Sequence, residues 1–510
     1  MLKKAHKILR SRYLWAVFVI VLEFAQLLAV FTLLFEYFLP ITVMGIVFHV
    51  GVLLYVINKD GIPEFKIPWL IILFFLPVIG AFIYMLFTST GQSRKDYQKF
   101  QDAHRRLQVY TEQPKEVMEE LKKVDADAWS QASYLYHAAG MPCSSGAVTY
   151  YPVGEKFHEA LLESLGMAEK FILMEYFIIQ PGKMWDSIHE ILKEKAAQGV
   201  KIYLMYDDFG CMVTLPEQYY KEMEKEGIGC IPCNKFKPVL SRIHNNRDHR
   251  KITVIDGKVG FTGGVNLADE YINEVVKYGH WKDTAVKIEG EAVRNLTILF
   301  LELWNMQVKE PMEGGPFLYM DRTVRQGEGA VIPYGDGPEP LYSETIGKNV
   351  YLNMIHTARE YLYITTPYLI CDHELMSALK LAAERGVDVR LITPHIPDKK
   401  IIFLMTRSGY EALIKSGVKI YEYTPGFVHA KTMVCDDKFA VCGTINLDYR
   451  SLVHHFECGA WMYHVDAVAD MKKDFLDMLS VSEQIIKENA KLKPWLRLPA
   501  EVLKIFAPLL

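Results

Sequence analysis

Apolar residues gather most densely at the start of this 510-residue chain. Three long apolar runs lie at about residues 13–35, 38–57 and 67–87, and the third contains no charged residue over 21 positions. A helix that crosses a bilayer needs about 20 apolar residues. The first run is too long for a signal peptide, and no small-residue cleavage site follows it. The pattern therefore predicts a membrane region of two or three transmembrane helices at residues 1–90.

Basic residues gather on both sides of this region, at residues 3–12 and 94–106. If all three runs span, a cytoplasmic N-terminus places the rest of the chain outside. The positive-inside tendency instead puts both basic clusters in the cytoplasm, which requires an even number of crossings. The first two runs then share one crossing, or the first lies in the interface. We expect both basic clusters and the remainder of the chain in the cytoplasm, and the sequence leaves open which of these two arrangements the first run adopts. The eight cysteines without a pairing scheme are compatible with a reducing compartment.

Beyond the membrane region, amphipathic helices alternate with short apolar strands. Residues 91–132 are polar and helix-prone, and we interpret them as a helical linker arm. Two similar series follow: helix 157–165, strand 171–174, helix 185–198 and strand 200–206, then helix 350–359, strand 361–364, helix 375–385 and strand 387–392. A glycine follows the second helix of each series. Such repeated units predict an α/β fold in which helices cover the sheets.

The repeat also predicts the domain boundaries. We expect two pseudo-symmetric halves at residues 133–310 and 341–490, joined by an inter-half loop at residues 311–340. The C-terminal segment 491–510 is apolar with a few interspersed charges. It either lies on a membrane surface or packs on the globular part, and the sequence leaves both alternatives open.

Each half carries the same motif, H-x-K-x4-D. The two copies consist of His249, Lys251 and Asp256, and of His429, Lys431 and Asp436. On a strand, residues two positions apart lie on the same face, so each histidine and lysine are expected side by side. The aspartate begins a turn to a second strand, after which a small-residue turn ends in Asn266 or Asn446. Two matched copies predict one site formed between the halves.

The residue types in the two motifs suit chemistry on an anion. Lys251 and Lys431 can neutralise phosphate oxygens, and the amides of Asn266 and Asn446 add neutral donors. One histidine can attack phosphorus to give a phosphohistidine, while the other exchanges protons with the leaving and entering oxygens. The motif aspartates at the strand ends are interpreted as structural or as orienting the histidines. Because lysines and amides can hold the developing charge, no metal and no cofactor are expected.

Other features carry weaker signals. The net charge of −4 provides no basic field for nucleic acid, so no nucleic-acid partner is expected. His244 and His280 lie near the first motif and are interpreted as satisfied polar histidines. Cys230 and Cys233 form a lone C-x-x-C without a second pair, which is a weak indication of zinc or redox chemistry. The sequence leaves the oligomeric state open.

At this point the residues resemble a known family. The double H-x-K-x4-D, with Gly263-Gly264-Val265-Asn266 and Gly443-Thr444-Ile445-Asn446 following, resembles the phospholipase D superfamily. The surrounding segments 245–251, 280–284 and 443–451, the apolar run from Pro68 to Tyr84 and the last four residues look like bacterial cardiolipin synthases. The resemblance covers about residue 38 to the end. It departs in the extra apolar run before residue 38 and in the wide gap between the halves.

The resemblance implies an activity, a substrate and site residues. The family joins two phosphatidylglycerol molecules into cardiolipin, releasing glycerol, in the bacterial inner membrane. By resemblance, the two histidines, two lysines and two aspartates of the motifs are catalytic, Asn266 and Asn446 support the phosphate, and Glu457 is a further site member. The rival readings are a phospholipase D-type hydrolase that uses water as acceptor, a nuclease, and a non-catalytic membrane scaffold; the intact H-x-K pairs argue against the last.

Overall fold

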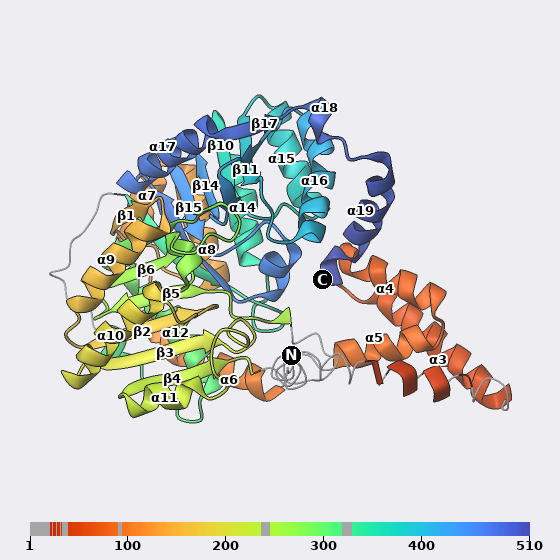
Figure 1. Cartoon of the computed structure of the whole chain (residues 1–510), viewed down its shortest axis with the longest axis horizontal. Helices are drawn as coiled ribbons and strands as arrows, with labels where there is room; N and C mark the ends of the chain where they lie inside the picture. Colours follow the sequence, from red (N-terminus) through yellow and green to blue (C-terminus); the bar gives the residue numbers. More distant parts are fainter. Residues whose placement is uncertain are drawn as a thin grey trace. The chain divides into compact units, whose positions relative to one another are not determined.

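The computed structural model describes residues 21, 22, 24–26, 28–30, 32, 39–89, 94–235, 245–318 and 329–509. They divide into two compact units, and Figure 1 labels many of their helices and strands. The small unit consists of the described residues within 1–93, 236–245 and 502–510. The large unit consists of the described residues within 94–235 and 246–501 and contains both H-x-K motifs.

The small unit is built from three apolar helices, α3 (Leu39–Asn58), α4 (Pro63–Phe75) and α5 (Ile79–Ser89). Their shared core includes Val56, Trp69, Leu73 and Tyr84, and the rings of Trp69 and Tyr84 meet edge to face at 5.1 Å. The C-terminal turn η5 (Ala507–Leu509) returns to this cluster and packs Leu509 against it.

The predicted transmembrane helices are not confirmed. No helix in the described part of the chain is long and apolar enough to cross a membrane. The third apolar run is divided, because the chain turns at Pro77 and at Val78, whose φ is +64°. The resulting helices α4 and α5 have 13 and 11 residues, about 20 and 17 Å at 1.5 Å per residue, which is shorter than the roughly 30 Å of a hydrocarbon core. Most of the first run lies outside the described residues.

The large unit contains two mixed sheets. The first has the order β1-β8-β6-β5-β2-β3-β4 and the second β17-β12-β11-β10-β14-β15-β16-β9. The first sheet comprises β1 (Ala147–Tyr151), β2 (Phe171–Tyr176), β3 (Lys201–Asp207), β4 (Ile228–Cys233), β5 (Lys251–Ile255), β6 (Val259–Gly263) and β8 (Ala285–Glu289). The second comprises β9 (Ala330–Asp336), β10 (Tyr361–Thr365), β11 (Asp388–Pro394), β12 (Lys419–Tyr423), β14 (Thr432–Cys435), β15 (Phe439–Gly443), β16 (Glu457–Tyr463) and β17 (Ser482–Ile485).

The two sheets repeat one topology. Starting from β9, the second sheet matches the first strand for strand and adds β17 at the far edge. In each, three parallel strands (β2, β3 and β4, or β10, β11 and β12) adjoin an antiparallel group that contains the motif hairpin. The prediction of two similar α/β halves is therefore confirmed.

Helices cover the sheets in both halves, as the sequence predicts (Figure 1). In α9, Phe157, Leu161 and Leu165 recur every four residues and are all buried, which explains its position on the sheet. The helices of the first half are α9 (Gly154–Gly166), α10 (Lys183–Ala197), α11 (Tyr219–Lys225) and α12 (Val293–Gln307). Those of the second half are α14 (Ile346–Thr357), α15 (His373–Glu384), α16 (Lys400–Lys415), α17 (Asp466–Ser480) and the short α18 (Lys487–Ala490), followed by α19 (Pro494–Phe506).

Residues interpreted above as a linker arm form α6 (Arg94–Leu107), η1 (Gln108–Tyr110), α7 (Lys115–Val124) and α8 (Ala126–Ala139). These helices pack on the large unit, α6 against α12 and α8 against α14 and β9. Phe100, Leu107 and Leu135 are buried in the main core. The segment is helical and also an integral layer of this unit.

The segment expected to be an inter-half loop contains α13 (Gly315–Leu318) and strand β9. Pro333 lies inside β9, and a proline within an apolar run argues against a strand. The strand forms nevertheless because β9 is the edge of its sheet and pairs only with β16 among the described strands. A proline costs no ladder hydrogen bond on the open side of an edge strand.

Candidate active site

The motif histidines lie just before the hairpins, where the two halves meet. The backbone N–H of His249 donates to the carbonyl of Phe456 at 2.9 Å, and that of His429 donates to the carbonyl of Lys282 at 2.7 Å. Phe456 belongs to the second half and Lys282, in β7 (His280–Lys282), to the first. Strand β7 also pairs with β13 (Gly426–Val428), directly before His429. Each histidine is thus fixed by the backbone of the opposite half.

The residue after each of these carbonyls is an acid that contacts the same histidine. Nδ1 of His249 lies 2.9 and 3.0 Å from the two carboxylate oxygens of Glu457, and Nδ1 of His429 lies 2.6 Å from Asp283. Both acids are completely buried. When Nδ1–H donates to a carboxylate, the proton of a neutral imidazole is held there and the lone pair is on Nε2. Each half therefore supplies the acid that orients the histidine of the other half. In each imidazole the lone pair on Nε2 is available to accept a proton or to attack a substrate.

Burial keeps both imidazoles neutral. It lowers the pKa of His249 to about 3 and that of His429 to about 4, although Glu457 and Asp283 partly oppose this effect. Burial also favours the protonated form of the two acids, but the facing histidines outweigh it and lower both carboxyl pKa values below their ordinary range. At neutral pH the site thus pairs ionised carboxylates with neutral imidazoles, the form in which a histidine can act as a nucleophile.

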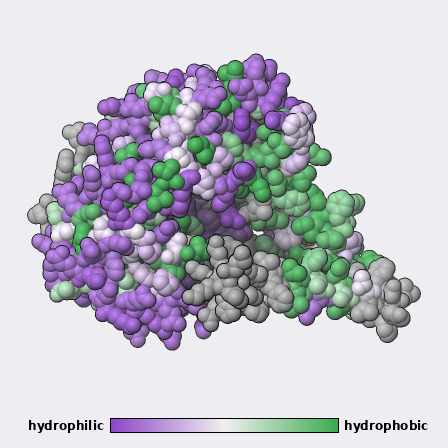
Figure 2. All heavy atoms as spheres, in the orientation of Figure 1, coloured by the Kyte–Doolittle hydropathy of each residue, from purple (hydrophilic) through white to green (hydrophobic). Residues whose placement is uncertain are grey.

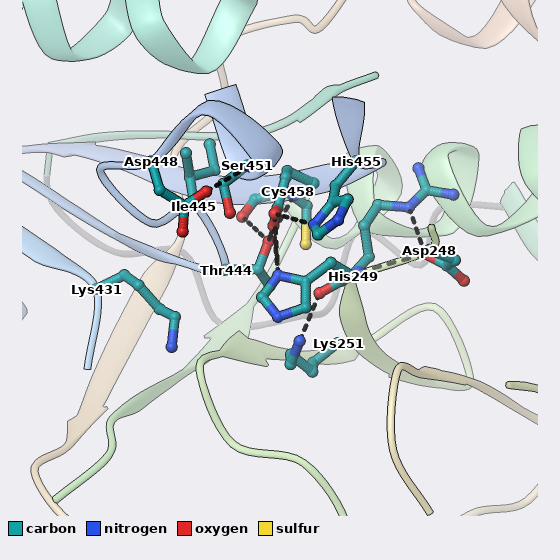
Figure 3. A network of polar contacts seen from close by, with 12 residues as sticks. Asp248, His249, Lys251, Lys431, Thr444, Ile445, Asp448, Ser451, His455 and Cys458 are labelled. Atoms are coloured by element: carbon teal, nitrogen blue, oxygen red, sulfur yellow. Dashed lines mark hydrogen bonds and ion pairs between the residues drawn. The ribbon is translucent and has the colours of Figure 1, made fainter. Parts of the chain in front are cut away.

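The two lysines are buried beside the histidines. Nζ of Lys251 donates to the carbonyl of His249 at 2.5 Å, and Nζ of Lys431 contacts the carbonyl and, at 2.9 Å, Nδ1 of His429. Burial lowers the pKa of Lys251 to about 8 and that of Lys431 to about 7. Lys251 contributes to the low pKa of Lys431, which places both motifs in one electrostatic environment. In Figure 3, Lys251 and Lys431 reach toward the same space beside His249.

The two motif aspartates lie at the hairpin turns, where they accept backbone hydrogen bonds. Oδ atoms of Asp256 accept the backbone N–H groups of Glu169, Lys170 and Phe171 at 2.7–2.8 Å. Asp436 accepts those of residues 359–361 at 2.7–3.0 Å. Both aspartates also have a positive φ at the hairpin turn, 54° and 55°. They join each hairpin to the start of β2 or β10, as the structural alternative expects, while Glu457 and Asp283 contact the histidines.

The two asparagines are buried near the site and differ in their contacts. Asn266 accepts the N–H of Ile178 at 3.1 Å and donates to the hydroxyl of Tyr271 at 2.6 Å. The ring of Tyr271 in turn packs edge-on against His429 at 5.5 Å. Oδ1 of Asn446 has no hydrogen-bond partner among the described residues. The first asparagine therefore supports the wall around His429, and a phosphate-binding role for either stays a prediction.

The weaker candidates lie elsewhere. His280 in β7 is half-buried, and its Nδ1 lies 3.0 Å from the hydroxyl of Tyr423. His244 is outside the described residues. Cys230 and Cys233 are buried free thiols in β4, and no described metal-ligating residue joins them in a cluster.

Three residues that the sequence did not indicate as site members lie at the site, namely Asp283, Thr444 and His455. Thr444 donates its hydroxyl to Glu457, and Nδ1 of His455 lies 3.5 Å from the same carboxylate. A signal for Asp283 was present in the repeat. Asp283 lies two residues before β8 and Glu457 begins β16, and these strands are equivalent in the two sheets. Aligning the halves beyond the asparagine turns would have paired the two acids.

Comparison with known proteins agrees with this geometry. The family described as "Cardiolipin synthase, PLD-like domain" matches residues 161–304 and 351–479. A second family, "Phospholipase_D-nuclease N-terminal", matches residues 47–87. The cardiolipin synthase of Geobacillus kaustophilus is 34% identical over 451 residues, covering 88% of this chain and 89% of that protein. The chain belongs to the PLD-like cardiolipin synthase family.

Further relatives extend the family assignment. A cardiolipin synthase of Alkalihalophilus pseudofirmus is 33% identical over 468 residues (91% of this chain and 92% of that protein). An uncharacterised protein of Streptococcus mutans is 42% identical over 464 residues (90% and 100%). Among solved structures, a phosphatidylserine synthase of Haemophilus influenzae has a TM-score of 0.57 at 14% identity, covering 74% of this chain and 97% of that one, which supports the fold alone. The two family segments each contain one motif histidine and the acid that contacts the other.

Proposed function

We propose that this protein is a cardiolipin synthase, a phosphatidyltransferase that joins two phosphatidylglycerol molecules and releases glycerol. The observation that carries the proposal is the pair of neutral, carboxylate-oriented imidazoles beside two buried lysines. Two histidines with available Nε2 atoms provide one nucleophile and one proton carrier. In a member of this family, the anion that fits two lysines is the phosphodiester of a phospholipid.

The proposed reaction has two transfers. Nε2 of His249 attacks phosphorus, the bond to the glycerol oxygen breaks, and His429 protonates that oxygen as glycerol leaves. The bound phosphate is anionic and therefore raises the proton affinity of His429. A hydroxyl of the second phosphatidylglycerol then loses its proton to His429 and attacks phosphorus, which breaks the bond to His249. Lys251 and Lys431 neutralise the phosphate oxygens throughout, so the residues of the site supply the charge stabilisation.

Exposed apolar side chains support a membrane partner. In the small unit, Met44, Phe74 and Phe75 are each more than 70% exposed, and Figure 2 shows hydrophobic atoms gathered over its helices. In α19, Trp495, Leu498, Val502 and Ile505 recur at helical spacing and are exposed. Contiguous apolar patches of this kind mark interaction sites in proteins. Membrane lipids are the partner that suits both the patches and the proposed substrate.

For the location, we propose the bacterial inner membrane with the catalytic halves in the cytoplasm. The proposal rests on the two basic clusters that flank the apolar runs. A reporter that is active only in the cytoplasm, fused after Leu510, is expected to be active. A reporter that works only outside the cytoplasm and is active at the same position would contradict this orientation.

Lipid products test the function directly. Purified protein incubated with phosphatidylglycerol in detergent micelles is expected to give cardiolipin and glycerol in equal amounts, separated by thin-layer chromatography. A hydrolase with the same site would use water and give phosphatidic acid instead. Phosphatidic acid as the main product would establish this alternative. If neither cardiolipin nor phosphatidic acid formed, phosphatidyl transfer of any kind would be contradicted.

The lysines predict how activity depends on pH. Lys431 and Lys251, with pKa values of about 7 and 8, lose their charge as the pH rises through this range, and an empty site then binds a phosphodiester less well. We expect kcat/KM to fall above pH 7–8, and kcat to persist to higher pH because bound phosphate favours the charged lysines. In Lys431→Arg, whose guanidinium stays charged, the fall should move to higher pH even if the rate is lower. A flat kcat/KM up to pH 9 would contradict the role of the lysines.

A further inference from the structure

A third imidazole lies at the site and takes no part in the proposed reaction. His455 ends the turn that leads into β16, and its ring centre is 5.5 Å from that of His249. Figure 3 shows His455 beside His249. Nδ1 of His455 lies 3.5 Å from a carboxylate oxygen of Glu457, the acid that contacts His249. The His455 side chain is 90% buried, and its Nδ1 has no hydrogen-bond partner among the described residues.

The internal repeat shows that His455 is not needed for the shared geometry. The carbonyls that hold the two motif histidines belong to Phe456 and Lys282, so His455 corresponds to Trp281. The Trp281 ring centre lies 5.7 Å from that of His429, nearly the same separation. The first half thus places an indole where the second places an imidazole. An indole cannot bind a metal ion, whereas an imidazole nitrogen is a common ligand.

The donor atoms around Glu457 have the separations of a metal site. One nitrogen of His249, one nitrogen of His455 and a carboxylate oxygen of Glu457 all lie within 4.8 Å of one another. Tetrahedral zinc with bonds of about 2.0–2.1 Å separates its ligands by about 3.3 Å. The Nδ1–oxygen distances here are 2.9 and 3.0 Å for His249 and 3.5 Å for His455. Thr444 donates to Oε2 of Glu457, whereas Nδ1 of His455 lies near Oε1, so the threonine hydroxyl orients the carboxylate as hydrogen bonds to ligands do in metal sites.

We propose that His249, His455 and Glu457 form an inhibitory site for a borderline transition-metal ion such as Zn²⁺, with a water molecule or a phosphate oxygen as the fourth ligand. Two imidazoles and one carboxylate are a common three-ligand set for zinc and suit it better than Mg²⁺, which prefers oxygen ligands. In the equivalent place around His429 and Asp283, Trp281 provides no third ligand.

Metal binding would block attack by changing the position of one proton. In the free site Nδ1–H of His249 donates to Glu457, and the lone pair is on Nε2. A metal ion on Nδ1 uses the lone pair of that nitrogen, so the single proton of the neutral imidazole moves to Nε2. Nε2 then has no lone pair to attack phosphorus. The inhibitory consequence rests on the proposed function, whereas metal binding itself does not.

Cobalt provides a direct measurement of binding. The full chain in detergent, first treated with EDTA and then freed of it, is titrated with Co²⁺, whose visible absorption is intense in tetrahedral sites. We expect one tetrahedral site per chain, displaced by Zn²⁺ and unaffected by excess Mg²⁺. His455→Gln should weaken binding at least about tenfold, and so should His455→Asn, while the exposed control His356→Gln should bind as the parent does.

Lipid transfer assays then test inhibition. EDTA should leave the activity unchanged or raise it, and Zn²⁺ should inhibit reversibly. Expressed relative to each variant's own uninhibited rate, His455→Gln should need at least about ten times more Zn²⁺. An unchanged Co²⁺ spectrum and affinity in both folded His455 variants would overturn the site. Activity that is lost with EDTA and restored by Zn²⁺ would overturn its inhibitory role. Since absorption needs no turnover, failure of the metal site and failure of the proposed function give different results.

Discussion

Replacing either His249 or His429 with alanine is expected to lower lipid transfer by a factor on the order of 10⁴ or more. The two imidazoles act in the same phosphoryl transfers, so loss of one removes most of the benefit of the other, and the double variant should be little worse than either single one. The measurement is cardiolipin formed from phosphatidylglycerol under saturating conditions. The exposed His356→Ala should retain parent activity and control for general effects of losing a histidine.

The two variants should differ in what they trap. In His429→Ala, His249 retains its contact with Glu457 and can still attack, but the leaving glycerol lacks its acid and the second transfer lacks its base. Labelled phosphatidyl-enzyme should therefore accumulate, most clearly with a substrate whose leaving group needs no proton. In His249→Ala no covalent adduct should form.

Label on the His249→Ala protein and its absence from His429→Ala would reverse the assignment of the two histidines. Full activity in either variant would contradict the shared site. The asymmetry around the histidines gives a structural basis for unequal roles, because His249 lies beside Phe177 and His455, whereas Tyr271 and Trp281 pack against His429.

Replacing Arg250 with methionine is expected to destabilise the large unit by about 3–5 kcal/mol, the usual effect of removing one partner of a buried ion pair. The guanidinium is 1% exposed, and its Nε donates to Glu175 at 2.6 Å and lies 3.7 Å from Asp248. Asp207 adds a further buried carboxylate, which accepts the backbone N–H of Asp248. Methionine would leave Glu175 and Asp248 without this counter-charge, whereas Asp207 keeps its own ion pair with Arg247 at 3.6 Å.

Thermal unfolding of the purified protein in detergent measures this effect. Burial already raises the pKa of Asp248 and Glu175 in the folded state. The pKa of each of these carboxyls is near 4 in the unfolded chain and higher in the folded one. Their contribution to stability is therefore fully present below about pH 4 and is lost as the pH rises through the folded-state pKa. The deficit of Arg250→Met should therefore be larger at pH 8 than at pH 5. Arg105→Met, which removes an exposed pair with Asp102, should cost at most about 1 kcal/mol. Equal effects of the two substitutions would contradict the importance of burial.

Local pattern was sufficient to predict the hairpins and the α/β halves. Asp256-Gly257 indicates a tight turn because aspartate and glycine both tolerate a positive φ, and they adopt φ values of 54° and 66° here. Strand–helix alternation identifies the units of each sheet, since burial on both faces gives continuous apolar strands. The motif residues were found because they occur twice at the same spacing.

Features that depend on distant partners were not accessible in this way. Whether Asp283 or Asp256 contacts a histidine depends on how the two halves pair, and spacing within one half does not contain that information. Strand β9 resembles a loop because of Pro333, and only its edge position makes the proline acceptable. The break between α4 and α5 lies inside an uninterrupted apolar run, where hydropathy alone cannot distinguish one helix from two.

The exchange of acids between the halves has a consequence for biogenesis. A newly made first half contains His249 and Asp283, and a newly made second half contains His429 and Glu457, but neither contains a matched imidazole–carboxylate pair. A partly synthesised or partly folded chain therefore lacks the carboxylate contacts that orient the two imidazoles. The matched imidazole–carboxylate pairs form only when the two halves have packed against each other, so the site is completed only at the end of folding.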